Sequence, residues 1–133
     1  KNRERYDIVT AFELFEHYDA PKEEIKNLAV LGDTIIFSTL LLPEPAPKPD
    51  EWWYYSTSTG QHISFYTKRA LEYCAQSIGR YHTGSTGIHI FSKRPISSWQ
   101  FRLAVSRIGW ILSRAQRESL LPKDYERLTG EKI

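Results

Sequence analysis

Apolar residues alternate between β-type runs and stretches with helical spacing in the first part of the chain. Residues 6–10 are β-branched and aromatic, which predicts a short buried strand, and the apolar run 34–40 predicts a second strand buried on both faces. Between them, apolar residues at helical spacing over 22–29 predict a helix with Asp19 as its N-cap. The pair Gly32-Asp33 predicts a turn between this helix and the second strand.

The middle of the chain combines a proline-rich stretch with a second helical pattern. Four of the seven prolines fall within residues 43–49, which indicates a stiff, extended loop rather than regular structure. After it, apolar positions at helical spacing predict a helix capped by Thr67 and ended by Gly79.

The last part of the pattern predicts a hairpin and a long helix. Two β-type segments, 80–83 and 88–93, flank a Gly-Ser-Thr-Gly sequence that favours a β-hairpin. An apolar stripe predicts a helix over 98–118. Strands separated by helices pair in parallel through right-handed crossovers, so we expect an α/β domain with a mixed sheet. Residues 1–97 would form this domain, and 98–133 a helical tail packed on it.

Four segments carry a pattern more specific than the order of strands and helices. They are 6–17, which ends in Glu13-Leu14-Phe15-Glu16-His17, then 31–39, 60–67 and the hairpin turn 84–87. In this order they resemble the fourth strand, the fifth strand, the loop before the fifth helix and the terminal strand pair of class I S-adenosylmethionine-dependent methyltransferases. The ubiquinone-biosynthesis O-methyltransferase type is the most similar. The resemblance implies the C-terminal half of a Rossmann-like methyltransferase fold, a mixed sheet with a terminal antiparallel hairpin and a C-terminal helix.

The resemblance also implies a cofactor, S-adenosylmethionine, and methyl transfer to an oxygen of a small-molecule acceptor. Thr10, Ala11 and Phe12 lie at the end of the first strand and directly after it, and they are the expected cofactor contacts. Such enzymes hold the cofactor with a Gly-rich turn after their first strand and an acidic residue after their second. Nothing upstream of Tyr6 supplies either feature. We therefore expect a partial chain that lacks most of the cofactor pocket and is inactive by itself.

Two carboxylates and an imidazole have a spacing that suits a metal ion. Glu13, Glu16 and His17 lie at i, i+3 and i+4, so on a helical turn they would share one face, at the carboxyl end of a strand. His62 is the expected fourth ligand. In the enzymes resembled, and in small-RNA 2′-O-methyltransferases, matching residues surround Mg²⁺, which implies that His17 and His62 are catalytic. The alternative is that the two glutamates are solvated and that His17 caps or packs locally.

Aromatic residues are concentrated directly after the proline-rich loop. Trp52, Trp53 and Tyr54 would form a lid or a wall against the substrate. The alternative interpretation is that these rings attach a long loop to the core. The cluster precedes His62 in the sequence.

Charge and cysteine content limit the partners. Lys plus Arg exceeds Asp plus Glu by only 18 to 16, a net charge of +2, so neither nucleic acid nor a membrane surface is an expected partner. The single cysteine, Cys74, excludes an internal disulfide and favours the cytoplasm. The alternative function is a non-catalytic, methyltransferase-like binding module. Its exposed sheet edge would self-associate, as a homo-oligomer, or pair with a separate N-terminal half.

Overall fold

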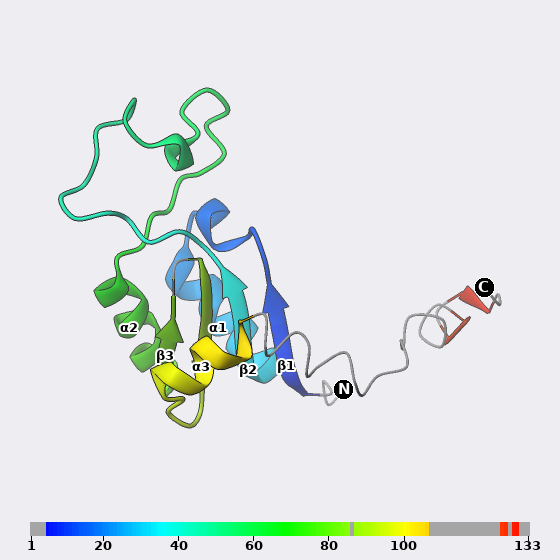
Figure 1. The fold of residues 1–133 in the computed structure, drawn as a ribbon. Coiled ribbons are helices and arrows are strands. Elements are labelled where there is room, and N and C mark those ends of the chain that lie inside the picture. Colours follow the sequence, from blue (N-terminus) through cyan, green and yellow to red (C-terminus); the bar gives the residue numbers. More distant parts are fainter. Residues whose placement is uncertain (1–4, 86, 107–125, 128, 131–133) are drawn as a thin grey trace. The chain divides into compact units, whose positions relative to one another are not determined.

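The computed structural model describes residues 5–85, 87–106, 126–127 and 129–130. The chain divides into two compact units, residues 1–101 and 102–133. The predicted division into residues 1–97 and a helical tail stays a prediction. The first unit contains the sheet and the candidate site (Figure 1). The elements in chain order are β1 (Tyr6–Ala11), η1 (Phe15–His17), α1 (Pro21–Leu31), β2 (Gly32–Ser38), η2 (Trp53–Tyr55), α2 (Lys68–Ser77), β3 (Tyr81–Gly84), β4 (Ile88–Ser92) and α3 (Ser98–Ala104).

The four strands form one mixed sheet in the order β1-β2-β4-β3. β1 pairs in parallel with β2, with Tyr6 opposite Gly32 and Ala11 opposite Phe37. β4 pairs antiparallel with both β2 and β3. The predicted α/β class, the parallel pairing and the terminal hairpin are therefore confirmed. Parallel strands end at the same edge of the sheet, so the segments that follow β1 and β2 begin close together at that edge.

The prediction that the first strand is buried is wrong. β1 is an edge strand among the described residues, and the side chains of Tyr6 and Ile8 are 59% and 55% exposed. Ala11, at the end of the strand, is buried. β-branched and aromatic residues indicate that a segment suits a strand. They do not indicate whether that strand lies inside a sheet or at its edge.

Two predictions at the ends of α1 are also wrong. The N-cap is Ala20, without a side-chain cap bond, rather than Asp19, because Pro21 takes the first helical position. Gly32 and Asp33 form no turn, since α1 leads directly into β2. A Cβ atom on Gly32 would lie 2.6 Å from Val9 Cγ2 and 2.8 Å from the Tyr6 carbonyl oxygen. This glycine therefore allows β1 to approach closely.

The predictions for the second helix are confirmed. The Ala70 N–H donates to the Thr67 side-chain oxygen, 3.1 Å away, at the start of α2, and Gly79 has a φ of +67° just after its end. Leu71 and Ala75 are fully buried.

The core lies against the segment that joins β1 to α1. The Phe15 ring stacks on the Phe37 ring of β2 with 3.9 Å between centroids, and both residues are fully buried. Phe91 of β4 packs against Phe37 with 4.6 Å between centroids. This aromatic contact fixes η1 over the end of the sheet, and with it the two residues that follow Phe15.

The predicted long helix is confirmed at its start, Ser98, but it ends earlier than predicted. α3 ends at Ala104, and residues 105–106 form a turn and a bend. Leu103 and Val105 are 42% and 49% exposed, so the apolar stripe has little to pack against at this point. Residues 107–125 of the prediction lie outside the described residues. Within the described part of the chain, no helix has the length and apolar character needed to cross a membrane.

Candidate metal centre

Residues 61–66, which follow the proline-rich loop and the aromatic cluster, run along η1. Figure 1 shows η1 and this loop at the end of the sheet where β1 and β2 finish. The Ile63 and Ser64 N–H groups donate to the Glu16 carbonyl oxygen, at 2.9 and 3.0 Å. The Tyr66 hydroxyl donates to the Phe15 carbonyl oxygen at 2.8 Å. Backbone geometry thus fixes residues 62–66 against η1, although 46 positions separate Glu16 from His62.

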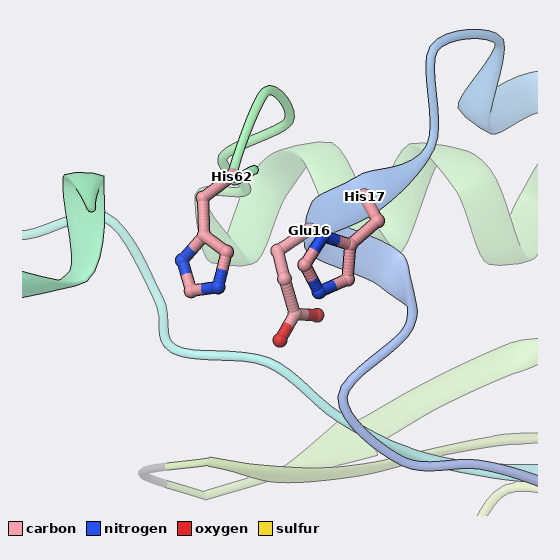
Figure 2. Close-up of side chains that lie close together, drawn as sticks. All are labelled: Glu16, His17 and His62. Carbon is pink, nitrogen blue, oxygen red and sulfur yellow. The ribbon is translucent and has the colours of Figure 1, made fainter. Parts of the chain in front are cut away.

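This packing brings three ionisable side chains together. Glu16, His17 and His62 each offer a ligand atom, and these atoms lie within 4.8 Å of one another. Figure 2 shows the Glu16 carboxylate between the two imidazole rings, whose centroids are 5.0 Å apart. Three of the four predicted ligands therefore form one cluster, and the interpretation of Glu16 as solvated is wrong because it is fully buried.

The Glu16 carboxylate is unusual because it is buried without a hydrogen bond. Neither of its oxygens has a partner within the part of the chain that the structure describes. A buried carboxylate is costly unless it is hydrogen-bonded, paired with a cation or bound to a metal ion. This environment therefore suits a cation or a metal ion as a partner of the carboxylate.

Hydrogen bonds also determine which nitrogen of each histidine is available. His17 Nδ1 lies 2.8 Å from the Gln61 carbonyl oxygen, and His62 Nδ1 lies 2.6 Å from the Tyr54 carbonyl oxygen. A carbonyl oxygen only accepts, so each Nδ1 carries the proton and each Nε2 keeps its lone pair. Metal-binding histidines in proteins typically have this arrangement, in which a carbonyl or carboxylate orients the ring.

The residues present fit a divalent ion. Two imidazole nitrogens and one carboxylate form a three-ligand set of the kind that leaves coordination positions open for water or substrate. The unpartnered oxygens of Glu16 supply the negative charge that such an ion requires.

Glu13 lies outside this group. The expected helical turn is not formed over it: η1 begins at Phe15, and Glu13 has a left-handed backbone with a φ of 49°. Its N–H donates to Ser38 Oγ at 2.7 Å, and the Ser38 hydroxyl donates back to Glu13 Oε1 at 2.7 Å. Its role as a ligand stays a prediction.

Comparison with known proteins identifies the family. Residues 1–80 of the 133 match the model of a methyltransferase domain family. The chain belongs to this methyltransferase family. The matched residues include Glu16, His17 and His62. No curated protein matches the chain significantly.

The predicted cofactor contacts follow the methyltransferase domain's first described strand. Thr10 and Ala11 end β1 and Phe12 begins the turn after it, at the same edge of the sheet as η1. Ala11 is buried, whereas Thr10 and Phe12 are exposed. Their role in binding a cofactor stays a prediction.

The predicted substrate contacts have three different environments. Trp52 is half-buried and packs against Tyr54, Tyr55 and Phe65, at centroid distances of 5.2, 4.9 and 5.9 Å. Trp53 is 77% exposed. Tyr54 is only 3% exposed, and its ring lies 4.6 Å from the His62 ring. Most of these rings hold the loop of the methyltransferase domain together, and substrate binding stays a prediction.

A second histidine pair lies in the hairpin. The His89 Nε2–H donates to the Thr39 carbonyl oxygen at 3.0 Å, so His89 Nδ1 accepts from the His82 Nε2–H, 3.1 Å away. Burial, with the nearby His89 and Lys68 charges, lowers the pKa of His82 to about 4, and burial lowers the pKa of His89. Both rings are therefore neutral at pH 7 and pack within the domain.

The sequence gives no signal for the groups that orient the ligands. Two of them are backbone carbonyls, of Gln61 and Tyr54, and any residue type supplies such a group. Ser38 and Thr39 also contribute hydroxyls next to the site. In the sequence, these two residues indicate only the end of a strand.

Proposed function

We propose that this methyltransferase domain belongs to an S-adenosylmethionine-dependent O-methyltransferase of the ubiquinone-biosynthesis type. Its acceptor would be a small molecule whose hydroxyl group binds next to a divalent ion on Glu16, His17 and His62. The observation that carries the proposal is the buried Glu16 carboxylate, without a hydrogen bond, facing two histidines whose Nδ1 atoms are already occupied.

In this proposal the three side chains bind and orient rather than take protons. When bound, a divalent ion supplies a Lewis acid that lowers the pKa of an acceptor hydroxyl. Because both Nδ1 atoms donate to carbonyls and both Nε2 atoms serve as ligands, His17 and His62 would act as ligands. The fixed rings would place the acceptor oxygen next to the ion.

The donor set also favours a kind of ion. Imidazole nitrogens suit first-row transition ions such as Mn²⁺, whereas Mg²⁺ prefers oxygen ligands and retains its waters. With Glu13 bonded to Ser38, only one carboxylate of the cluster faces the site. We therefore expect Mn²⁺ to bind more tightly than the Mg²⁺ that the family resemblance implies.

The proposed cofactor position follows from the sheet. Thr10, Ala11 and Phe12 lie at the carboxyl end of β1, where α/β folds bind their ligands. A methyl donor bound there would lie on the same edge of the sheet as the metal cluster.

We also propose that the edge of β1 pairs with further strands, from an N-terminal half or from a second copy of the chain. β1 has one strand neighbour in the described sheet, and Tyr6 and Ile8 are largely exposed. An open strand edge with apolar side chains favours pairing with another chain. This arrangement would extend the sheet beside Thr10, Ala11 and Phe12, the proposed cofactor contacts.

Calorimetric titration of the purified chain with Mn²⁺ tests the central part of the proposal. We expect saturation at one ion per chain, and a loss of binding in Glu16→Ala and His62→Ala. Saturation that is unchanged in both variants would disprove the site. A parallel titration with S-adenosylhomocysteine reports on the cofactor: binding supports a pocket completed by association, and its absence supports a chain that is inactive alone.

A further inference from the structure

Tyr54 contacts the candidate metal centre at more than one point. Its backbone carbonyl oxygen accepts from His62 Nδ1 at 2.6 Å, and its ring lies 4.6 Å from the imidazole, inclined at 59°. Figure 2 shows His62 on the loop, facing Glu16. The same residue thus sets both the tautomer and the tilt of one ligand.

The Tyr54 hydroxyl group is buried next to the second ligand. It lies 3.3 Å from the hydroxyl of Thr39, a residue 2% exposed that follows β2. Burial raises the pKa of Tyr54, hydrogen bonds from Thr39 and the Leu40 backbone lower it, and the nearby charge of Glu16 raises it. The phenol therefore lies close enough to Glu16 for the two side chains to interact.

The neighbours of the Tyr54 hydroxyl determine where its proton is donated. The Thr39 hydroxyl is able to donate to the phenol oxygen, 3.3 Å away. The phenol proton then needs an acceptor, and the two Glu16 oxygens are buried acceptors without a partner in the described residues. Donation to Glu16 satisfies both groups at once.

We propose that Tyr54 is the positioning residue of the metal centre, which fixes His62 through its carbonyl and ring and orients Glu16 through its hydroxyl. This inference rests on the proposed function. Tyr54 does not touch the acceptor: at 3% exposure it lies behind the ligands. One carboxylate oxygen is held by the phenol, so the other is directed at the ion.

Tyr54→Phe tests this role because it removes the hydroxyl and keeps the ring and the carbonyl. Tyr55→Phe is the matched control, since Tyr55 belongs to the same aromatic cluster but donates to the Pro47 carbonyl oxygen at 2.9 Å. The probe is Co²⁺ added to the full 133-residue chain, followed by its visible absorption. Loss of a group that orients a ligand typically weakens metal binding about 10–100-fold. We expect about 10-fold weaker binding and an altered Co²⁺ spectrum in Tyr54→Phe, and neither change in Tyr55→Phe.

The outcomes separate this inference from the function on which it rests. If the wild-type chain does not bind Co²⁺, the proposed function fails. If the wild type binds and Tyr54→Phe matches it in affinity and spectrum, the positioning role is overturned while the metal centre stands. Should Tyr54→Phe lose its circular-dichroism signal, Thr39→Val is the second variant, because it removes the hydroxyl that lies 3.3 Å from the phenol oxygen and leaves Tyr54 intact. Weaker Co²⁺ binding in Thr39→Val supports the inference, and unchanged binding overturns it.

Discussion

The domain contains two pairs of histidines whose rings are almost equally far apart but whose hydrogen bonds differ. The His17 and His62 rings are 5.0 Å apart, and the His82 and His89 rings are 5.3 Å apart. In the first pair, both Nδ1 atoms donate to backbone carbonyls and a buried carboxylate lies beside the rings. In the second pair, one ring donates to the other and the chain of donors ends at the Thr39 carbonyl.

The difference shows that proximity of imidazoles does not make a metal site. Binding requires lone pairs that point at one place, together with negative charge to offset that of the ion. The first pair has both, with Glu16 as the charge. In the second pair, the His89 Nδ1 lone pair accepts from His82, so only the buried His82 Nδ1 keeps a lone pair without a partner among the described residues. No carboxylate joins this pair in the clusters found among the described residues.

The largest expected effect is the difference in Mn²⁺ affinity between variants that truncate one histidine of each pair. His62→Ala removes a proposed ligand and is expected to weaken Mn²⁺ binding by more than about 100-fold, beyond the effect of losing an orienting group. His82→Ala is the matched control, and we expect its Mn²⁺ affinity to stay within about 2-fold of the wild type. Calorimetry of both variants decides the comparison, and equal losses would show that the two pairs do not differ as described.

A second effect concerns Glu16 and stability. Saturating Mn²⁺ at 100 times its dissociation constant should raise the free energy of unfolding by about 2.7 kcal/mol, because the ion binds only the folded chain. Without metal, Glu16→Gln should be more stable than the wild type by about 1–2 kcal/mol, since a neutral amide costs less to bury than an unpartnered carboxylate. With Mn²⁺ the order should reverse. Urea unfolding in the two conditions measures both values, and an order that stays the same would contradict the site.

A smaller effect concerns the stability that the chain loses in acid because of His82 in the hairpin. His82 has a pKa of about 4 in the folded chain and an ordinary value near 6.5 when unfolded. The unfolded state therefore binds more protons between these values, and stability falls as the pH drops from 6.5 toward 4. Allowing for the partial exposure of His82, we expect a loss of about 1 kcal/mol between pH 7 and pH 5. Urea unfolding at the two pH values should show less loss in His82→Gln, and an identical loss would remove His82 as the cause.

The smallest expected effect defines the limit of the metal cluster. Glu13→Gln keeps an acceptor for Ser38 and removes a charge that lies outside the cluster. We expect Mn²⁺ affinity to change by less than about 2-fold, since exposed charges contribute little. A loss of 10-fold or more in the same calorimetric titration would instead show that Glu13 leaves Ser38 to bind the ion, as its spacing in the sequence predicts.

Elements whose ends carry local signals were predicted well. Thr67 and Gly79 mark the ends of α2 because a cap and a left-handed glycine act within one turn of the chain. The hairpin and the parallel pairing of β1 with β2 also follow from local patterns and short connections. In contrast, Gly32 suggested a turn, while its real role is to admit β1 from another part of the chain.

The candidate site was predicted in part for the same reason. Glu16 and His17 are neighbours in the sequence, but only the short turn of η1 brings both of their ligand atoms to one place. Glu13 was expected on the same face because an α-helical turn was assumed, and the chain instead turns left-handed there. His62 was proposed from the family resemblance, and hydrogen bonds between residues 61–66 and η1 bring it to the other two.

The sequence by itself determined the α/β class, the order of strands and helices, and the residue types able to hold a metal ion, because these depend on periodicity and on side-chain chemistry. Only the tertiary structure decided which of those residues meet. The packing of Phe15 on Phe37 buried Glu16, and the return of the loop along η1 placed His62 beside it. Burial, the loss of hydrogen-bond partners and the choice of tautomer arise between segments far apart in the chain, so no local pattern encodes them.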